Sequence, residues 1–425
     1  MTFAIFLAAL LGSMAMGVPI AFALLLCGVA LMSLQGGVDA TILSQKLLEG
    51  ADSFPLLAIP FFMLAGELMN AGGLSRRIVA FALAWVGHFR GGLGYVAILS
   101  SVVLAALSGS AIADAAALGA MLIPMMREAG YRVPRAAGLI AAGSVIAPVF
   151  PPSVALIVFG VIANVSIGKL FMAAIAPGLL MGLSLVLVWA WVSRHEPVKP
   201  LPRQSLRQRL RAGADGLWAL AMPVGIIGGM KLGIFTPTEA AVGATAYAFL
   251  VGKFVYRELR WQELRPLLVR SAKGTAVVVF LIAAALVSAW MITVSELPGQ
   301  IAALLEPFMD SPRLLMFVIM LVVVLVGTAL DFAPTVMILT PVLMPIVAQA
   351  GIDPVYFGVL FIMNNAIGLI TPPVGVVLNV IGGTARISMN AAARGALPFL
   401  AAELVVLALL VVFPELVLVP LRWLT

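Results

Sequence analysis

The chain is poor in charged residues, in histidine and in cysteine. Asp, Glu, Lys and Arg make up 10% of its 425 residues, and it has two histidines and one cysteine. The single cysteine, Cys27, excludes an internal disulfide and a cysteine-based metal site. The histidines, His88 and His195, lie beside Arg90 and Arg194 in polar connections, which does not favour a metal cluster.

Apolar residues take the place of charge. Hydrophobic residues form 63% of the sequence, and its mean hydropathy is +1.16. A soluble domain of this length could not bury that much apolar surface, so the composition predicts a multi-pass membrane protein. At roughly 20 residues per span, the apolar runs allow about ten to twelve crossings. The first run, residues 1–14, has no basic segment before it, so we expect a retained helix and no cleaved signal.

The net charge of +7 is spread over short connections, which favours a role in membrane topology over nucleic-acid binding. Most Lys and Arg residues fall in five connections: 76–90, 127–135, 194–211, 253–273 and 386–394. If these connections face the cytoplasm, two apolar stretches must each enter and leave the membrane on one side. We therefore predict two re-entrant helical hairpins, at about 92–126 and about 314–348, which dip in from opposite faces.

Small polar residues occupy the middle of each predicted hairpin. The first tip reads Ser108-Gly109-Ser110 and is followed by Asp114, and the second tip extends from Gly327 to Asp331. Irregular backbone at membrane depth is tolerated only where protein buries it or where it lines a watery cavity. An ionisable residue at that depth is a candidate functional residue. Both tips are therefore candidate sites.

Several motifs occur twice at nearly one offset. The pairs are Pro19 and Pro237, which are 218 residues apart, Asp114 and Asp331, which are 217 apart, and the starts of two Pro-Pro motifs, Pro151 and Pro372, which are 221 apart. The charge pattern gives the two halves opposite orientations. We therefore predict inverted repeats at 1–193 and 217–425, joined by a cytoplasmic linker at 194–216.

Each half carries its Pro-Pro pair inside a predicted helix, at about 136–165 and about 355–385. Proline removes an amide donor and clashes with the preceding turn, so two in a row should break a membrane helix. A break frees carbonyl oxygens for a small hard cation, and the helix start beyond it favours an anion. The sequence thus predicts an all-α polytopic membrane protein with two discontinuous helices and two hairpins.

Oxygen donors suited to Na⁺ lie near the tips and the breaks of both halves. They are Ser108, Ser110, Asp114 and Ser153 in the first half, and Thr328, Asp331, Thr335, Asn364, Asn365 and Thr371 in the second. Each feature also has a structural explanation, because Pro-Pro pairs kink helices, Ser and Gly form turns, and aspartate caps helices. The occurrence of every motif in both halves favours a functional role over a structural one, since a helix kink does not require a matching kink in the other half.

These motifs resemble those of the large membrane subunit of tripartite ATP-independent periplasmic (TRAP) transporters, the DctM-like proteins. The matching segments are SGSAIADAAALGAMLIPMMREAGY (108–131), PVFPPSVALIVFG (148–160), GIFTPTEAAVGA (233–244), GTALDFAPTVMILTPVLMPI (327–346) and NNAIGLITPPVGVVLN (364–379). They fall throughout the chain, so the resemblance covers nearly all of it. One departure is PVFPPS, where the family pattern is the more aliphatic PIIPPS, which puts Phe150 beside the first break.

The resemblance implies an elevator-type, Na⁺-driven importer in a bacterial inner membrane, with a fold like that of the ion transporter superfamily. A transport domain holding both hairpins would slide against a scaffold. The implied partners are a separate small four-helix membrane subunit and a periplasmic binding protein that delivers a dicarboxylate, a sialic acid or another carboxylate. Na⁺ is the expected coupling ion, and neither a cofactor nor an enzymatic activity is expected.

The resemblance also places Na⁺ where each hairpin tip meets the neighbouring broken helix. The first set is Ser108, Gly109, Ser110, Asp114, Pro148, Pro151 and Ser153, and the second is Gly327, Thr328, Asp331, Thr371, Pro372 and Gly375. The substrate would lie between the two tips. Its candidate contacts are Ser110, Ser153, Thr335, Asn364, Asn365 and Thr371.

Three alternatives stay open at this point. A carboxylate carrier coupled to Na⁺ or H⁺ that acts without a binding protein would share these features. An intramembrane aspartyl protease would use Asp114 and Asp331 to activate water, but its chemistry gives no reason for paired Pro-Pro breaks. An ion channel also uses re-entrant hairpins, although a channel usually builds its pore from symmetric oligomers. Counter-flow of labelled substrate distinguishes a carrier from a channel.

Overall fold

The computed structural model describes residues 2–195, 198, 200–328, 330 and 332–424, and the fold is all-helical over these residues. In the first half the elements are α1 (Thr2–Ala15), α2 (Ile20–Leu34), α3 (Ala40–Ala51), the short 3-10 helix η1 (Phe54–Leu57), α4 (Ala58–Ala71), α5 (Leu74–Val86), α6 (Gly92–Ser108), α7 (Ala111–Glu128), α8 (Val133–Ser144), α9 (Val154–Ile162), α10 (Ile167–Val192) and the 3-10 turn η2 (Ser193–His195).

In the second half the elements are α11 (Leu206–Lys231), α12 (Pro237–Leu250), the π-helical turn η3 (Val251–Val255), α13 (Trp261–Val294), α14 (Leu297–Met309), α15 (Pro312–Gly327), α16 (Phe332–Gln349), α17 (Pro354–Gly368), α18 (Val376–Ala385), α19 (Met389–Val412) and α20 (Glu415–Leu424). Each half contains, in the same order, a short helix, a hairpin of two helices, an interrupted helix and a long apolar helix.

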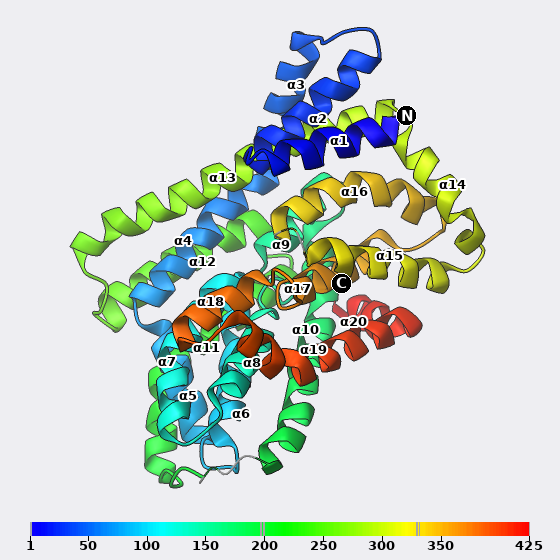
Figure 1. Cartoon of the computed structure of the whole chain (residues 1–425). Coiled ribbons are helices and arrows are strands. Elements are labelled where there is room, and N and C mark those ends of the chain that lie inside the picture. The colour runs from blue at the N-terminus through cyan, green and yellow to red at the C-terminus, as the bar shows by residue number, and fades with distance from the viewer. Residues whose placement is uncertain (1, 196–197, 199, 329, 331, 425) are drawn as a thin grey trace.

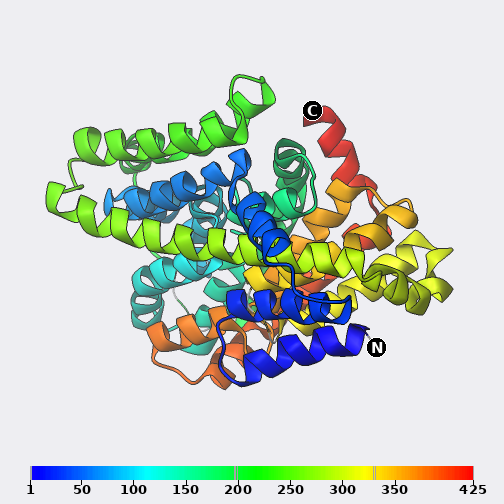
Figure 2. The same cartoon turned by 90° about the horizontal axis from the view of Figure 1, so that it is seen from above.

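The helices pack in two groups around the long helix α13. Helices α2, α3 and α4 contact α13, and α12 packs along α4. Figure 2 shows α13 crossing the molecule, with α4 on one side and α1 and α2 on the other. In the other group, α7 packs on α8 and α18, α8 on α19, and α15 on α17. Figure 1 shows this second group below α13. We call the two groups the α13 group and the hairpin group.

Both predicted hairpins coincide with pairs of helices joined by short turns. Helices α6 and α7 are separated by Gly109 and Ser110, and Gly109 adopts a φ of +59°, which glycine tolerates at no steric cost. Helix α15 ends at Gly327 and α16 begins at Phe332. The interrupted helices are α8–α9 and α17–α18, and the Pro151–Pro152 and Pro372–Pro373 peptide bonds within the interruptions are both cis.

The segment 194–216, which we expected to link the halves, becomes helical before its end. Ser205 and Gln208 form a capping box, in which the Ser205 hydroxyl accepts from the Gln208 amide and the Gln208 side chain accepts from the Ser205 amide. Helix α11 therefore begins at Leu206 and continues to Lys231. The basic stretch at 205–213 therefore includes the first part of this long helix.

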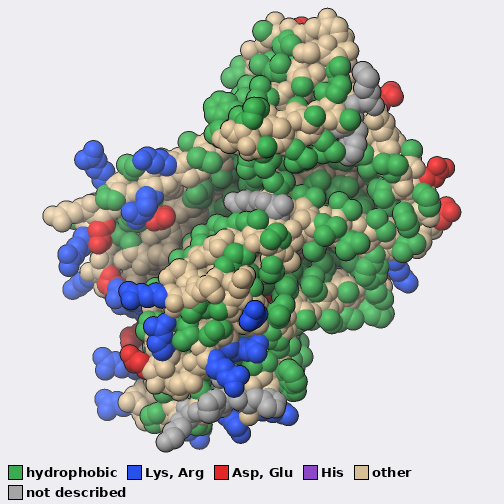
Figure 3. All heavy atoms as spheres, in the orientation of Figure 1, with side chains coloured by type: hydrophobic (Ala, Val, Ile, Leu, Met, Phe, Trp, Pro, Cys, Tyr) green, Lys and Arg blue, Asp and Glu red, His purple; other side chains and the backbone are tan. Residues whose placement is uncertain are grey.

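Within the described residues, six helical segments are long and apolar enough to cross a membrane: Phe54–Ala71, Ile167–Val192, Leu206–Lys231, Trp261–Val294, Phe332–Gln349 and Met389–Val412. Shorter apolar helices supplement them, among them the first helix of each hairpin, α6 and α15. Figure 3 shows Lys and Arg side chains gathered at the left and bottom of the molecule with some acidic side chains among them, hydrophobic side chains across its middle, and further acidic side chains at the right edge. The gathering of Lys and Arg toward one end fits a protein that spans a bilayer.

The interrupted helix α8 and the long helix α19 approach each other closely at glycines. A Cβ placed on Gly395 would lie 1.8 Å from the carbonyl oxygen of Pro134, and one on Gly138 would lie 2.3 Å from the amide nitrogen of Ala396. Neither contact involves a flexible side chain, so no atom can give way without moving backbone. Gly395 thus fixes the distance between the two helices.

We expect Gly395→Ala to destabilise the protein by about 1–3 kcal/mol, the usual cost of overpacking. The matched control is Gly213→Ala in α11, where an added Cβ would have no atom within 4 Å. Because alanine is the better helix former by about 1 kcal/mol, the control should be neutral or stabilising. Thermal unfolding in detergent measures both. Equal melting temperatures for the two variants would contradict the close approach of α8 and α19.

Candidate functional site

A cavity of about 340 Å³ lies between the hairpin group and the α13 group. Its walls come from α4, the first hairpin tip, the first break with α9, the middle of α13, the start of α16 and the second break. The residues lining it are Met63, Gly66, Glu67, Asn70, Ser108, Gly109, Ser110, Ala111, Ile112, Ala113, Pro148, Val154, Ala155, Val158, Arg270, Ser271, Val278, Phe332, Ala333 and Leu369. Its size and its mixture of apolar and polar groups are those of a small-molecule site.

The first hairpin tip lies directly against the first break. A Cβ on Gly109 would be 3.2 Å from the carbonyl oxygen of Pro152 and 3.4 Å from the Cα of Ser153. The Ser153 hydroxyl donates to the carbonyl oxygen of Pro148 and accepts from the Leu156 amide, so it caps α9. The Ser110 hydroxyl caps α7 in the same way. The predicted residues of the first set are therefore brought together, with the backbone of the break within reach of the tip.

Asp114 points its carboxylate into this tip. The side chain is 2% exposed and hydrogen-bonds to the Ser108 hydroxyl. Its second oxygen, Oδ2, has no hydrogen-bond partner among the residues the structure describes. A buried carboxylate oxygen without a donor is costly, and a bound cation would remove that cost. Asp114 is the charged member of the first predicted Na⁺ set.

The second tip meets the end of α17. A Cβ on Gly368 would lie 2.9 Å from the carbonyl oxygen of Gly327, and one on Gly327 would lie 3.3 Å from Asn365 Oδ1. The Nδ2 amide of Asn365 donates to the Phe332 carbonyl over 3.0 Å, and that of Asn364 donates to the Met320 carbonyl over 2.6 Å. Both Oδ1 atoms are buried and lack a partner within the described part of the chain. The two asparagines thus hold the hairpin with their donors and keep their acceptors open.

The other described residues of the second predicted Na⁺ set make local contacts or are exposed. The hydroxyls of Thr328 and Thr371 donate to carbonyls of their own helices, those of Leu325 and Ile367. Gly375 precedes α18 with a φ of +42°, and Pro372 is exposed. Asp331 lies outside the described residues, so its role stays a prediction.

Of the six predicted substrate contacts, Ser110 lines the cavity. Ser153, Thr335, Asn364 and Asn365 are fully buried behind it, and Thr371 lies at the second break. One of the six predicted contacts therefore lines the cavity, and the other five do not.

Two charged residues that line the cavity were not among the site residues predicted from the sequence. Arg270 of α13 and Glu67 of α4 form an ion pair with an Nη2 to Oε2 distance of 3.1 Å, and Arg270 Nε also donates to Oε2. Arg270 had been counted only among the basic connections that set topology, and Glu67 had been assigned no role. They are 203 residues apart, and no spacing or motif joins them. Asn70, one turn after Glu67, adds an amide to the same wall.

Comparison with known proteins identifies the family. The model of the tripartite ATP-independent periplasmic transporter DctM component matches residues 7–416. The chain belongs to this family and is a large permease subunit of a TRAP transporter, a multi-pass membrane protein. The resemblance expected from the motifs is confirmed.

Relatives that are named for their substrates support this placement. The 2,3-diketo-L-gulonate TRAP transporter large permease protein of Escherichia coli is 54% identical, with 99% of each chain covered. The C4-dicarboxylate large permease protein of Pseudomonas aeruginosa is 39% identical over 90% of each chain, and the sialic acid large permease protein of Vibrio cholerae is 38% identical over 95% of each.

Solved structures show the same fold at low sequence identity. The YdaH transporter of Alcanivorax borkumensis aligns with a TM-score of 0.66 and 15% identity, covering 92% of this chain and 95% of that one. The antimetabolite efflux pump MtrF of Neisseria gonorrhoeae aligns with a TM-score of 0.62 and 12% identity, covering 87% and 83%. At these identities the likeness concerns the fold alone.

Proposed function

We propose that this subunit carries a small organic acid across a bacterial inner membrane in symport with Na⁺. A periplasmic binding protein delivers the acid, and a separate four-helix membrane subunit completes the complex. The observation that carries the proposal is the 340 Å³ cavity, because both hairpins, both breaks and the α13 group contribute to its walls. A site built between two groups of helices changes its access when one group moves against the other, as an elevator mechanism requires.

The substrate class follows from the relatives and from the cavity. All three relatives named above are called transporters of acids, and the most similar of them is named for a sugar acid. The cavity offers a guanidinium at Arg270, hydroxyls at Ser108 and Ser110, and the Asn70 amide. A guanidinium binds carboxylates in bidentate geometry, and the neutral groups suit hydroxyls. We therefore propose a hydroxylated carboxylate, with its charge near Arg270.

Na⁺ coupling is supported by the unpartnered oxygens at the two tips. Asp114 Oδ2 lies at the first, and Asn365 Oδ1 lies at the second, where a Cβ on Gly327 would lie 3.3 Å from it. Carboxylate, amide and backbone oxygens are the donors that a hard cation prefers. The opposite orientation of the two halves, predicted from their charges, would then place one ion site on each hairpin.

A thermal unfolding experiment tests Na⁺ binding without knowledge of the substrate. We expect the complex to melt higher in NaCl than in KCl or choline chloride at equal ionic strength. A ligand that binds only the folded form at 100 times its Kd stabilises it by about 2.7 kcal/mol. Asp114→Asn should reduce the Na⁺-specific shift, because the amide keeps the shape but removes the charge. The same melting curve in all three salts would contradict Na⁺ coupling and favour a proton-coupled carrier.

A further inference from the structure

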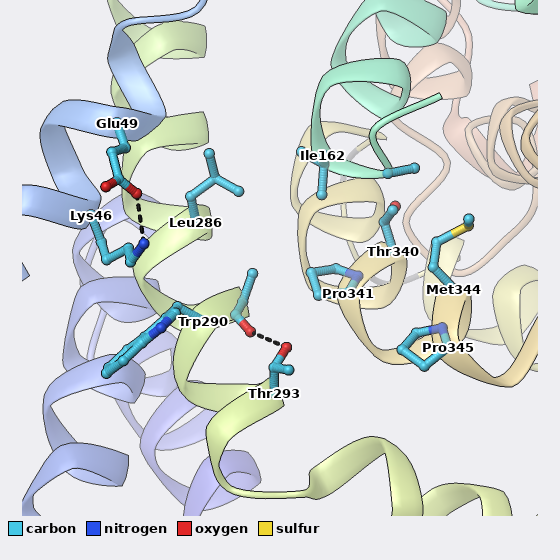
Figure 4. A pocket seen from close by; sticks show the side chains of 12 residues that line it. Lys46, Glu49, Ile162, Leu286, Trp290, Thr293, Thr340, Pro341, Met344 and Pro345 are labelled. Carbon is cyan, nitrogen blue, oxygen red and sulfur yellow. Dashed lines mark hydrogen bonds and ion pairs between the residues drawn. The ribbon is translucent and has the colours of Figure 1, made fainter. Parts of the chain in front are cut away.

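A second opening lies at the other end of α13. This cleft, of about 520 Å³, separates α3 and α13 from α9 and α16, and we call it the outer cleft. Figure 4 shows Lys46, Glu49 and Trp290 on one wall and Thr340, Pro341 and Met344 on the opposite wall. The α13 group thus forms the first wall, and the second helix of the second hairpin forms the other.

The outer cleft lies further along α13 than the cavity, about 12 Å from it along the helix axis, since Val278 lines the cavity and Leu286 lines the cleft. Arg270 lines the cavity and Trp290 lines the cleft, and the twenty residues between them on one helix span about 30 Å. The hydrocarbon core of a bilayer is also about 30 Å thick. Because Arg270 belongs to a basic connection that we predict to face the cytoplasm, we expect the cleft to face outward. Lys46 itself lies outside the five basic connections.

The cavity and the outer cleft are therefore each lined by a basic residue that forms an ion pair with a glutamate. Lys46 Nζ lies 2.6 Å from Glu49 Oε2, as Arg270 pairs with Glu67 at the inner end. Hydrogen bonds from Lys46 and Gln45 hold the pKa of the Glu49 carboxyl below its usual value. Lys46 is only partly exposed, with 27% of its side chain accessible. Because Lys46 lines the cleft, an anion in the cleft can approach its charge.

The opposite wall carries an unused hydrogen-bonding group. Thr340 is completely buried, lines the cleft, and its hydroxyl has no partner among the described residues. A buried hydroxyl without a partner is costly, so a ligand group that pairs with it gains affinity. Pro341 and Pro345 add to this, because neither can donate to the carbonyl four residues before it, on Met337 and Pro341. Trp290 supplies an apolar face across the cleft.

We propose that the outer cleft is a second binding site, which holds the hydroxylated organic acid on the outer side before it enters the cavity. The inference rests on the proposed function. The carboxylate takes a place beside Lys46 in competition with Glu49. A substrate hydroxyl pairs with Thr340, and the carbon skeleton lies on Trp290. The cleft volume of 520 Å³ is sufficient for such an acid.

The test uses the complete complex of both membrane subunits in phosphatidylcholine nanodiscs and proteoliposomes. The probes are 2,3-diketo-L-gulonate, succinate and N-acetylneuraminate. For the acid that wild type transports, equilibrium binding should give two acids per large subunit. Lys46→Gln and Thr340→Val should each weaken binding of the second acid roughly tenfold and raise KM by the same factor, the value of one charged or buried hydrogen bond, with kcat unchanged.

Variants that should lower KM, restore it or leave it unchanged serve as controls. Glu49→Gln removes the competing carboxylate, so it should lower KM. Lys46→Arg should restore most of the affinity. Lys231→Gln, an exposed lysine at the end of α11 away from the cleft, should leave KM and stoichiometry as in wild type. Thr340→Val keeps the shape and removes an unpartnered hydroxyl, so it should fold at least as well as wild type.

The outcomes separate this proposal from the proposed function. One acid per subunit in wild type, or wild-type KM in both Lys46→Gln and Thr340→Val, overturns the outer site, and Na⁺-driven uptake in the same vesicles would leave the proposed function standing. Absence of binding and uptake for all three probes overturns both. An effect of Lys46→Gln that appears only after phosphatidylglycerol is added would assign the cleft to a lipid headgroup and overturn the proposal.

Discussion

Replacement of Pro372 and Pro373 together by alanine should abolish uptake. Helix α17 ends at Gly368 and α18 begins at Val376, and the prolines between them withhold amide donors. Each proline-to-alanine change favours a helix by about 3 kcal/mol, so two changes shift the break toward a continuous helix by roughly 10,000-fold. A continuous helix would withdraw the carbonyl oxygens that face the second hairpin.

The measurement is Na⁺-driven uptake into proteoliposomes, with helix content followed by circular dichroism. The matched control is Pro398→Ala, because Pro398 lies inside the continuous helix α19 and at no break. The control should transport normally. Wild-type uptake by the double variant, together with unchanged helix content, would mean that the prolines only bend the chain.

Arg270→Gln should raise the KM for the transported acid by roughly 10- to 100-fold, because a hydrogen bond to a charged group contributes about 1.5–3 kcal/mol. Arg270→Lys should recover part of the loss, since an ammonium keeps the charge but not the bidentate geometry. Glu67→Gln should lower KM, because it releases Arg270 from its 3.1 Å ion pair. Uptake kinetics over a range of substrate concentrations measure all three variants.

Arg265→Gln is the control for Arg270. It removes an exposed positive charge from the same helix and the same basic connection, but Arg265 does not line the cavity. Its KM should equal that of wild type. If Arg265→Gln and Arg270→Gln lost affinity equally, the effect would come from the overall charge of the inner face and not from a contact with the substrate.

The sequence located the features that are encoded locally. Glycine and proline restrict the backbone of their own neighbourhood, so Gly109 and the two Pro-Pro pairs marked the turns and breaks without any knowledge of packing. The first hairpin, expected at 92–126, coincides with α6 and α7, which end at Glu128. The first break is longer than its prolines alone require, since α8 already ends at Ser144. Family membership followed from the same motifs and is confirmed.

The sequence could not locate what depends on packing between distant helices. Glu67 and Arg270 meet because α4 lies along α13, and Lys46 faces Thr340 because two groups of helices leave a space there. In a membrane protein most Lys and Arg residues lie in loops and determine the topology. The sequence alone does not distinguish the few that line a binding site from these. Inverted orientation, sliding of the hairpin group and Na⁺ coupling stay predictions for the experiments above.

The two breaks differ in accessibility. Pro151 and Pro152 are buried, whereas Pro372, Pro373 and Val374 are exposed. An ion held by the exposed backbone of the second break would therefore leave more readily than an ion at the first, which would have to wait for the tip at Gly109 to lift away. Two coupled ions would then leave in a fixed order. Excess Na⁺ on the receiving side would slow the cycle mainly by refilling the second break.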